Sequence, residues 1–133
     1  MISSDISQME ILFMQSSSFY SLSVTTVLWC VIGFGAMALP IKSMNSDDIQ
    51  NRIIAILHGV IMTAYGFYCL FLDYDLDGPN ELIHVAFSSV SCGYFIFDTV
   101  FKIVLKTMDQ DLLIHHILCI LGSSAILLSG HSG

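Results

Sequence analysis

Residues 82–101, LIHVAFSSVSCGYFIFDTVF, decide the fold of this chain. The stretch is as long as a helix that crosses a bilayer core, which needs about 20 mainly apolar residues. Asp98 is the only Asp, Glu, Lys or Arg within it, and Glu81 and Lys102 lie just outside its two ends. We therefore predict a transmembrane helix over residues 82–101.

Three further stretches have the same length and apolar character, namely residues 22–41, 53–72 and 112–128. The linkers between the four stretches are short and polar, so that each helix is expected to lie antiparallel to the next. We predict an all-α fold: a polytopic bundle of four transmembrane helices over residues 22–133. Residues 1–21 form an N-terminal segment outside the predicted spans.

The composition agrees with a chain that lies in lipid. Hydrophobic residues make up 55% of the 133 residues and charged residues 11%, and the mean hydropathy is +0.78. Soluble domains carry about 25% charged residues. The net charge of −7 argues against a nucleic-acid partner, because no basic patch could meet the phosphates. The four cysteines lie within apolar runs without a CxxC pair, and we expect neither a metal site nor a cofactor.

The basic residues indicate the orientation in the membrane. Lys42 and Arg52 flank the first linker, Lys102 and Lys106 lie in the third, and the acidic linker 73–81 has no basic residue. Basic residues concentrate in cytoplasmic loops. The first and third linkers are therefore expected in the cytoplasm, and the N-terminal segment in the lumen or outside the cell.

Four ionisable residues inside the predicted spans suggest a functional site, because such groups are costly in hydrocarbon. They are His58, Asp98, His115 and His116. Each lies four to six residues inside a charged boundary residue, which places it about 6–9 Å deep at the helical rise. Three helices thus bring ionisable groups to one depth, and we expect Asp98 to contact at least one of the paired histidines.

Helical spacing extends this cluster along the faces of three helices. We expect an interhelical cavity lined by His58, Tyr65, Tyr94, Asp98, His115, His116 and Cys119. Alternatives remain: Asp98 and Lys102 at i, i+4 could form only an ion pair, and His58 could be a packed histidine. A metal site made by the histidines and Asp98 is a third, although no short-range ligand motif supports it. His84 is not counted, since it lies near the opposite boundary.

The run Gly93-Tyr94-Phe95-Ile96-Phe97-Asp98-Thr99, followed after a short loop by His115-His116, resembles the TLC domain. Ceramide synthases and TRAM-type translocon proteins share this domain, and the small TLC-domain membrane proteins are the most similar. The resemblance covers residues 53–133. Cys119 and Ile126-Leu127 depart from the synthase pattern, and the later carboxylates of the synthases have no counterpart before Gly133. We therefore expect a partial, truncated TLC domain.

The resemblance implies a multi-pass membrane protein that binds lipid or affects membrane lipid composition. The alternative is a lipid-modifying enzyme, an N-acyltransferase that uses acyl-CoA, with His115, His116 and Asp98 as its catalytic candidates. The missing carboxylates favour the first hypothesis for this chain. The expected partners are membrane lipids and a packing helix or a second copy. The expected location is the endoplasmic reticulum, with the plasma membrane or Golgi as alternatives.

The orientation can be tested with engineered glycosylation acceptors. An acceptor placed in a lengthened 73–81 linker should be modified, because the basic residues lie on the other side of the membrane. The measurement is the gel shift that a glycosidase reverses. Modification of an acceptor in the linker between Lys42 and Arg52 would show that the orientation is the reverse.

Overall fold

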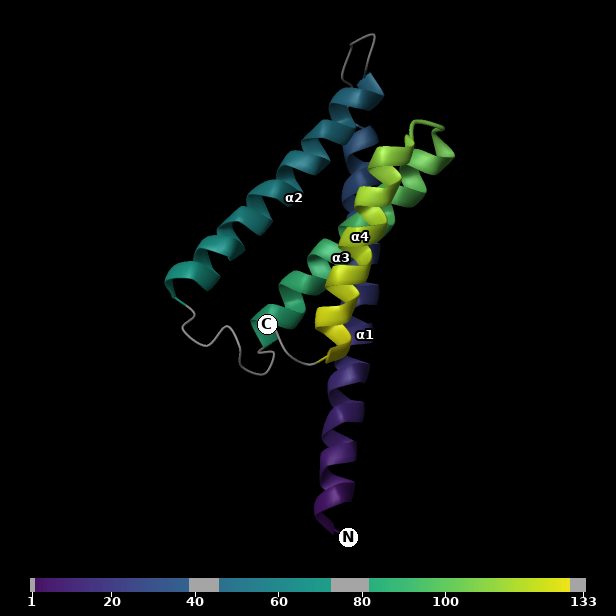
Figure 1. The fold of residues 1–133 in the computed structure, drawn as a ribbon. Coiled ribbons are helices and arrows are strands. Elements are labelled where there is room, and N and C mark those ends of the chain that lie inside the picture. The colour runs from purple at the N-terminus through teal and green to yellow at the C-terminus, as the bar shows by residue number, and fades with distance from the viewer. Residues whose placement is uncertain (1, 39–45, 73–81, 130–133) are drawn as a thin grey trace.

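Four helices form the described part of the chain in a computed structural model (Figure 1). They are α1 (Ile2–Met37), α2 (Ser46–Phe71), α3 (Leu82–Val104) and α4 (Gln110–Ser129). The structure describes residues 2–38, 46–72 and 82–129, and side chains within 16–38, 52–72 and 82–129. The helices contain four apolar spans of 20–23 residues: Ser16–Met37, Arg52–Phe71, Leu82–Val104 and Gln110–Ser129. The predicted all-helical bundle with four membrane spans is confirmed.

The helices are longer than the apolar stretches from which they were predicted. α1 begins at Ile2 rather than near residue 22, because neither proline nor glycine occurs before Gly33 to interrupt the helix. It therefore extends beyond the other helices at its N-terminal end (Figure 1). α3 continues to Val104, past the predicted end at residue 101. Residues 39–41 of the first predicted span lie outside the described residues.

α3 is the central helix. Within its apolar window 44% of the residues are buried, against 11% in each of the other three. α1 and α4 pack along it, and α2 makes fewer contacts with the bundle (Figure 1). Small and polar residues form most of its buried face, namely His84, Ser88, Ser89, Ser91, Cys92, Gly93, Tyr94, Phe97 and Asp98. Small residues let helix backbones approach in lipid, where packing replaces the hydrophobic drive.

The backbones of α1 and α3 approach closely at Gly93. A Cβ atom built there would lie 2.9 Å from the backbone nitrogen of Thr26 and 3.1 Å from the Thr25 hydroxyl. Two side chains of α1 also bond to α3 carbonyls. The Thr25 hydroxyl donates to Ser89 at 2.8 Å, and the Trp29 indole N–H donates to Val90 at 2.9 Å.

A tight turn joins α3 to α4. The N–H of Thr107 donates to the Lys102 carbonyl at 2.9 Å, and the N–H of Lys106 donates to the Ile103 carbonyl at 3.1 Å. Lys106 has a φ of 58°, the left-handed conformation that usually ends such a helix. Asp109 then caps α4 by accepting the N–H of Leu112 at 2.8 Å. Five residues, 105–109, thus reverse the chain. The end of the bundle with this turn and Arg52 is called the basic end below.

Gly93 and Gly122 form a matched pair for testing the α1–α3 contact. Gly93→Ala should lower the free energy of unfolding by about 2 kcal/mol, because the added Cβ meets the α1 backbone and overpacks the interface. A Cβ added at Gly122 has no neighbouring atom within 4 Å. Gly122→Ala should therefore leave the free energy of unfolding unchanged or raise it slightly. Unfolding of the purified chain in mild detergent measures both. Equal effects of the two substitutions would contradict the close packing at Gly93.

Candidate functional site

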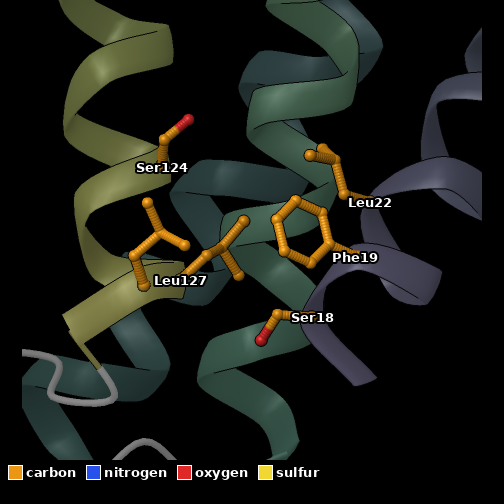
Figure 2. A pocket seen from close by; sticks show the side chains of 6 residues that line it. Ser18, Phe19, Leu22, Ser124 and Leu127 are labelled. Atoms are coloured by element: carbon orange, nitrogen blue, oxygen red, sulfur yellow. The ribbon is translucent and has the colours of Figure 1, made fainter. Parts of the chain in front are cut away.

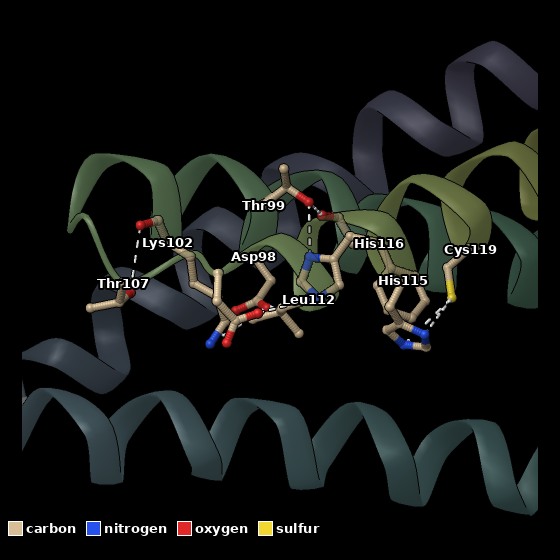
Figure 3. A network of polar contacts seen from close by, with 10 residues as sticks. Asp98, Thr99, Lys102, Thr107, Leu112, His115, His116 and Cys119 are labelled. Atoms are coloured by element: carbon tan, nitrogen blue, oxygen red, sulfur yellow. Dashed lines mark hydrogen bonds and ion pairs between the residues drawn. The ribbon is translucent and has the colours of Figure 1, made fainter.

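The centre of the candidate site is a buried pair formed by Asp98 of α3 and His116 of α4 (Figure 3). Asp98 Oδ2 lies 3.4 Å from His116 Nε2. The two residues are 2% and 3% exposed. The contact expected between Asp98 and a paired histidine is therefore present. A buried ionisable group requires a partner of this kind, because an unpaired charge in the interior is very costly.

The hydroxyl of Thr99 determines how many protons this pair holds. Thr99 Oγ1 donates to the Phe95 carbonyl at 2.6 Å and lies 2.9 Å from His116 Nδ1. A hydroxyl has one proton to donate. If that proton lies on the Phe95 carbonyl, His116 Nδ1 is the donor to Thr99. In this tautomer, one further proton between His116 Nε2 and the Asp98 carboxyl would make the pair neutral as a unit.

Lys102 connects this pair with the basic end. Its Nζ lies 4.0 Å from Asp98 Oδ2, one helical turn away, and its side chain is 21% exposed. The ion pair proposed from the i, i+4 spacing is therefore present, but Asp98 has the nearer partner in His116. The ammonium is the charge of this group that lies nearest to the α3–α4 turn.

A second polar group joins α2 to the bundle through His58. The His58 ring stacks on Tyr94 of α3, with centroids 3.9 Å apart and an 11° interplanar angle. Its Nε2 lies 3.3 Å from the Ser91 hydroxyl, and Trp29 of α1 approaches edge-on at 6.0 Å. His58 is thus a packed histidine between three helices, as the alternative interpretation proposed.

Phe95 lies between the two polar groups. Its ring packs edge-on against His58 and against His116, each at a centroid distance of 5.3 Å. It also meets His115 at 5.8 Å. An aromatic ring, rather than a polar cavity, therefore separates the His58 group from the Asp98–His116 pair.

The described contacts of the remaining predicted residues are with partners other than Asp98, although the His115 ring lies 5.8 Å from that of His116. His115 is exposed and lies beside Cys119, with 3.7 Å between Nε2 and Sγ (Figure 3). Tyr65 stacks on Phe87 at 4.3 Å and approaches His84 at 6.3 Å, about three to four turns of α3 from Asp98. Tyr65 is therefore on the expected face of α2 but at a different depth.

Four residues that take part in these contacts were not among the predicted site residues. Two of them, Phe95 and Thr99, lie within the motif quoted for the family resemblance, and their closeness to Asp98 in the sequence could have identified them. Trp29 is the only tryptophan in the chain, a residue that needs a partner for its N–H when buried. His84 was set aside as a boundary residue, but it is buried in the bundle, with 2% of its surface exposed.

Two cavities of the described part of the bundle lie against α1. A space of about 100 Å³ separates α1 from α4 and is lined by Ser18, Phe19, Leu22, Ser124, Leu127 and Leu128 (Figure 2). A larger groove of about 380 Å³ lies between α1 and α3. None of the seven residues predicted to line a cavity borders either space. Within the described residues, no three His, Cys, Asp or Glu side chains are placed to hold a metal ion.

Comparison with known proteins identifies the family. The family model of the TLC domain matches residues 48–132 of the 133. The chain belongs to the TLC domain family, and it is a multi-pass membrane protein of that family. The match includes α2, α3 and α4, and thus His58, Asp98 and both paired histidines. No solved structure matches the chain.

Adjacent histidines provide a matched test of the buried pair. His116→Ala should lower the free energy of unfolding by about 3 kcal/mol, because it leaves the Asp98 carboxyl without its nearest partner. His115→Ala removes an exposed ring and should change it by less than about 0.5 kcal/mol. Asp98→Asn should cost much less than Asp98→Ala, since an amide N–H can donate to His116 Nε2 without the shared proton.

Thermal unfolding in detergent measures all four variants. Two results would contradict the neutral pair. One is a destabilisation by His115→Ala as large as that by His116→Ala. The other is an Asp98→Asn variant as unstable as Asp98→Ala.

Proposed function

We propose that this TLC-domain chain binds membrane lipid and thereby affects the lipid composition of its membrane. The observation that carries the proposal is the row of polar side chains from the His116–Asp98 pair to Lys102 at the basic end. Ionisable residues within membrane spans usually mark a functional site. Lys102 is the outermost member of the row, and its partly exposed ammonium is the part that a lipid could meet.

A lipid phosphate is the group that suits this position. An ammonium is a compact charge with three donors, which binds phosphate as a point charge. At 4.0 Å the Lys102–Asp98 contact is longer than a hydrogen bond. Lys102 could therefore turn to a headgroup without leaving Asp98 unpaired, because His116 remains beside the carboxyl.

The N-acyltransferase alternative has one observation in its favour. A carboxyl beside a histidine is the arrangement that orients a catalytic base. A base must also reach the proton that it abstracts. Both ring nitrogens of His116 are engaged, by Thr99 and Asp98, and the residue is 3% exposed. We therefore expect no acyl transfer by this chain alone.

Lipid retention by a charge-matched pair of variants tests the proposal. The chain is placed in nanodiscs of phosphatidylcholine with a minor fraction of phosphatidic acid, extracted in mild detergent, and its retained lipid is measured by mass spectrometry. In the lipid retained by wild type and by Lys102→Arg, the fraction of phosphatidic acid should be several-fold higher than in the disc, because both chains carry a cation at this position. Lys102→Gln should retain clearly less phosphatidic acid than Lys102→Arg, because it lacks the cation at this position.

Two outcomes would count against the proposed site. Equal retention by Lys102→Gln and Lys102→Arg would exclude Lys102 as the headgroup contact. N-acylated product from the same samples, given a long-chain base and acyl-CoA, would favour the enzyme instead, provided that His116→Ala abolishes it and His115→Ala does not.

A further inference from the structure

A second candidate lipid site lies on a different face of α3. The groove of about 380 Å³ between α1 and α3 is lined by one stripe of residues from each helix. The lining includes Cys30, Phe34, Met37, Val100, Phe101 and Val104. The Phe97 ring occupies the space beside Gly33, so it closes the groove from the inside. All of these residues lie within the apolar spans of α1 and α3.

The length of the groove corresponds to one leaflet of a bilayer. Its α1 wall extends from Thr26 to Met37, eleven residues along the helix. At the helical rise this is about 16 Å, close to half of a hydrocarbon core of about 30 Å. Because Met37 is at the end of α1 beside the basic end, the groove lies in the leaflet on that side.

The side chains of the groove favour a flexible chain as the occupant over another helix. Helices associate in lipid through small residues that let their backbones approach. Here the walls carry large side chains that project outward, since Phe34 is 64% and Val104 71% exposed. The volume of about 380 Å³ holds on the order of ten methylene groups, each close in size to a water molecule's share of about 30 Å³.

A cation lies at the mouth of the groove. Leu105 is part of the lining, and the next residue is Lys106, which is exposed. The carbonyls of Lys102 and Ile103 are already satisfied by the N–H groups of the turn. The Lys106 ammonium is therefore not required to cap α3, and it can reach a headgroup at the membrane surface.

We propose that this groove binds one acyl chain of an anionic phospholipid from the leaflet at the basic end, with Lys106 contacting the headgroup phosphate. This site is separate from Lys102 and the Asp98–His116 pair, and it does not rest on the function proposed above. A lipid held there would cover the exposed seam between α1 and α3. It would thereby stabilise the packing of α1 on the central helix.

Photolabelling of the chain in nanodiscs tests the groove. The probe is phosphatidylglycerol with a diazirine in its acyl chain, as a minor component in phosphatidylcholine, and labelled residues are mapped by mass spectrometry. Labels should concentrate several-fold on the groove residues of α1 and α3 relative to the exposed α2 face at Ile56, Val60 and Phe67. Excess unlabelled phosphatidylglycerol should remove the excess labelling, and phosphatidylcholine should not.

Two valines of similar exposure provide the matched variants. Val100→Trp should fill the groove and abolish the labelling of Phe34, whereas Val60→Trp on α2 should not change it. Asparagine tolerates the left-handed backbone conformation of residue 106, so Lys106→Asn removes the charge without disturbing the turn. This variant should label less selectively with phosphatidylglycerol, whereas Lys106→Arg should keep the selectivity.

The labelling pattern of the wild-type chain decides the proposal even if a variant does not fold. Equal labelling of the groove and the α2 face would show ordinary surrounding lipid and overturn the site. Equal labelling by phosphatidylglycerol and phosphatidylcholine probes would overturn the headgroup contact. Disulfide-linked dimers of a Val100→Cys variant would show that a second copy occupies the groove. If Lys102→Gln and Lys102→Arg retained equal phosphatidic acid, the function proposed above would fail, but the proposal for the groove would still stand.

Discussion

Hydrocarbon cannot form hydrogen bonds, and this constraint explains how the four spans are arranged. Each of the other helices contributes one ring with a polar nitrogen to α3. Trp29 of α1 donates to the Val90 carbonyl, His58 of α2 approaches the Ser91 hydroxyl, and His116 of α4 lies between Thr99 and Asp98. α3 is therefore the most buried helix because it carries the groups that the others must meet.

The tight α3–α4 turn sets the register of the buried pair. Asp98 lies eight residues before Lys106 and His116 seven residues after Asp109, so both side chains are at nearly the same distance from the turn. Lys106 adopts a left-handed conformation that costs a residue with a side chain about 1 kcal/mol or more. The hydrogen bonds of Lys106, Thr107 and Leu112 hold it there. A longer turn would not place Asp98 beside His116 so closely.

Charged boundary residues made the spans and the common depth of Asp98 and the histidines predictable. The sequence could not decide between His115 and His116, because adjacent residues point about 100° apart and the rotation of α4 is set by its packing. Tyr65 was placed on the correct face of α2, but spacing along one helix gives no partner on another. The position of Phe95 between His58 and His116 was not predicted either, because an apolar ring carries no such signal in the sequence.

A proton shared between Asp98 and His116 would limit what the pair can do. Two separate charges in the interior would each lose several kcal/mol of solvation, whereas a neutral Asp98–His116 unit avoids most of that cost. Such a unit is stable because its proton stays between the two groups. A catalytic base, by contrast, must exchange a proton with its substrate. The arrangement therefore suits a fixed connection between α3 and α4. In the proposed function, the lipid contact is accordingly at Lys102 and not at the imidazole.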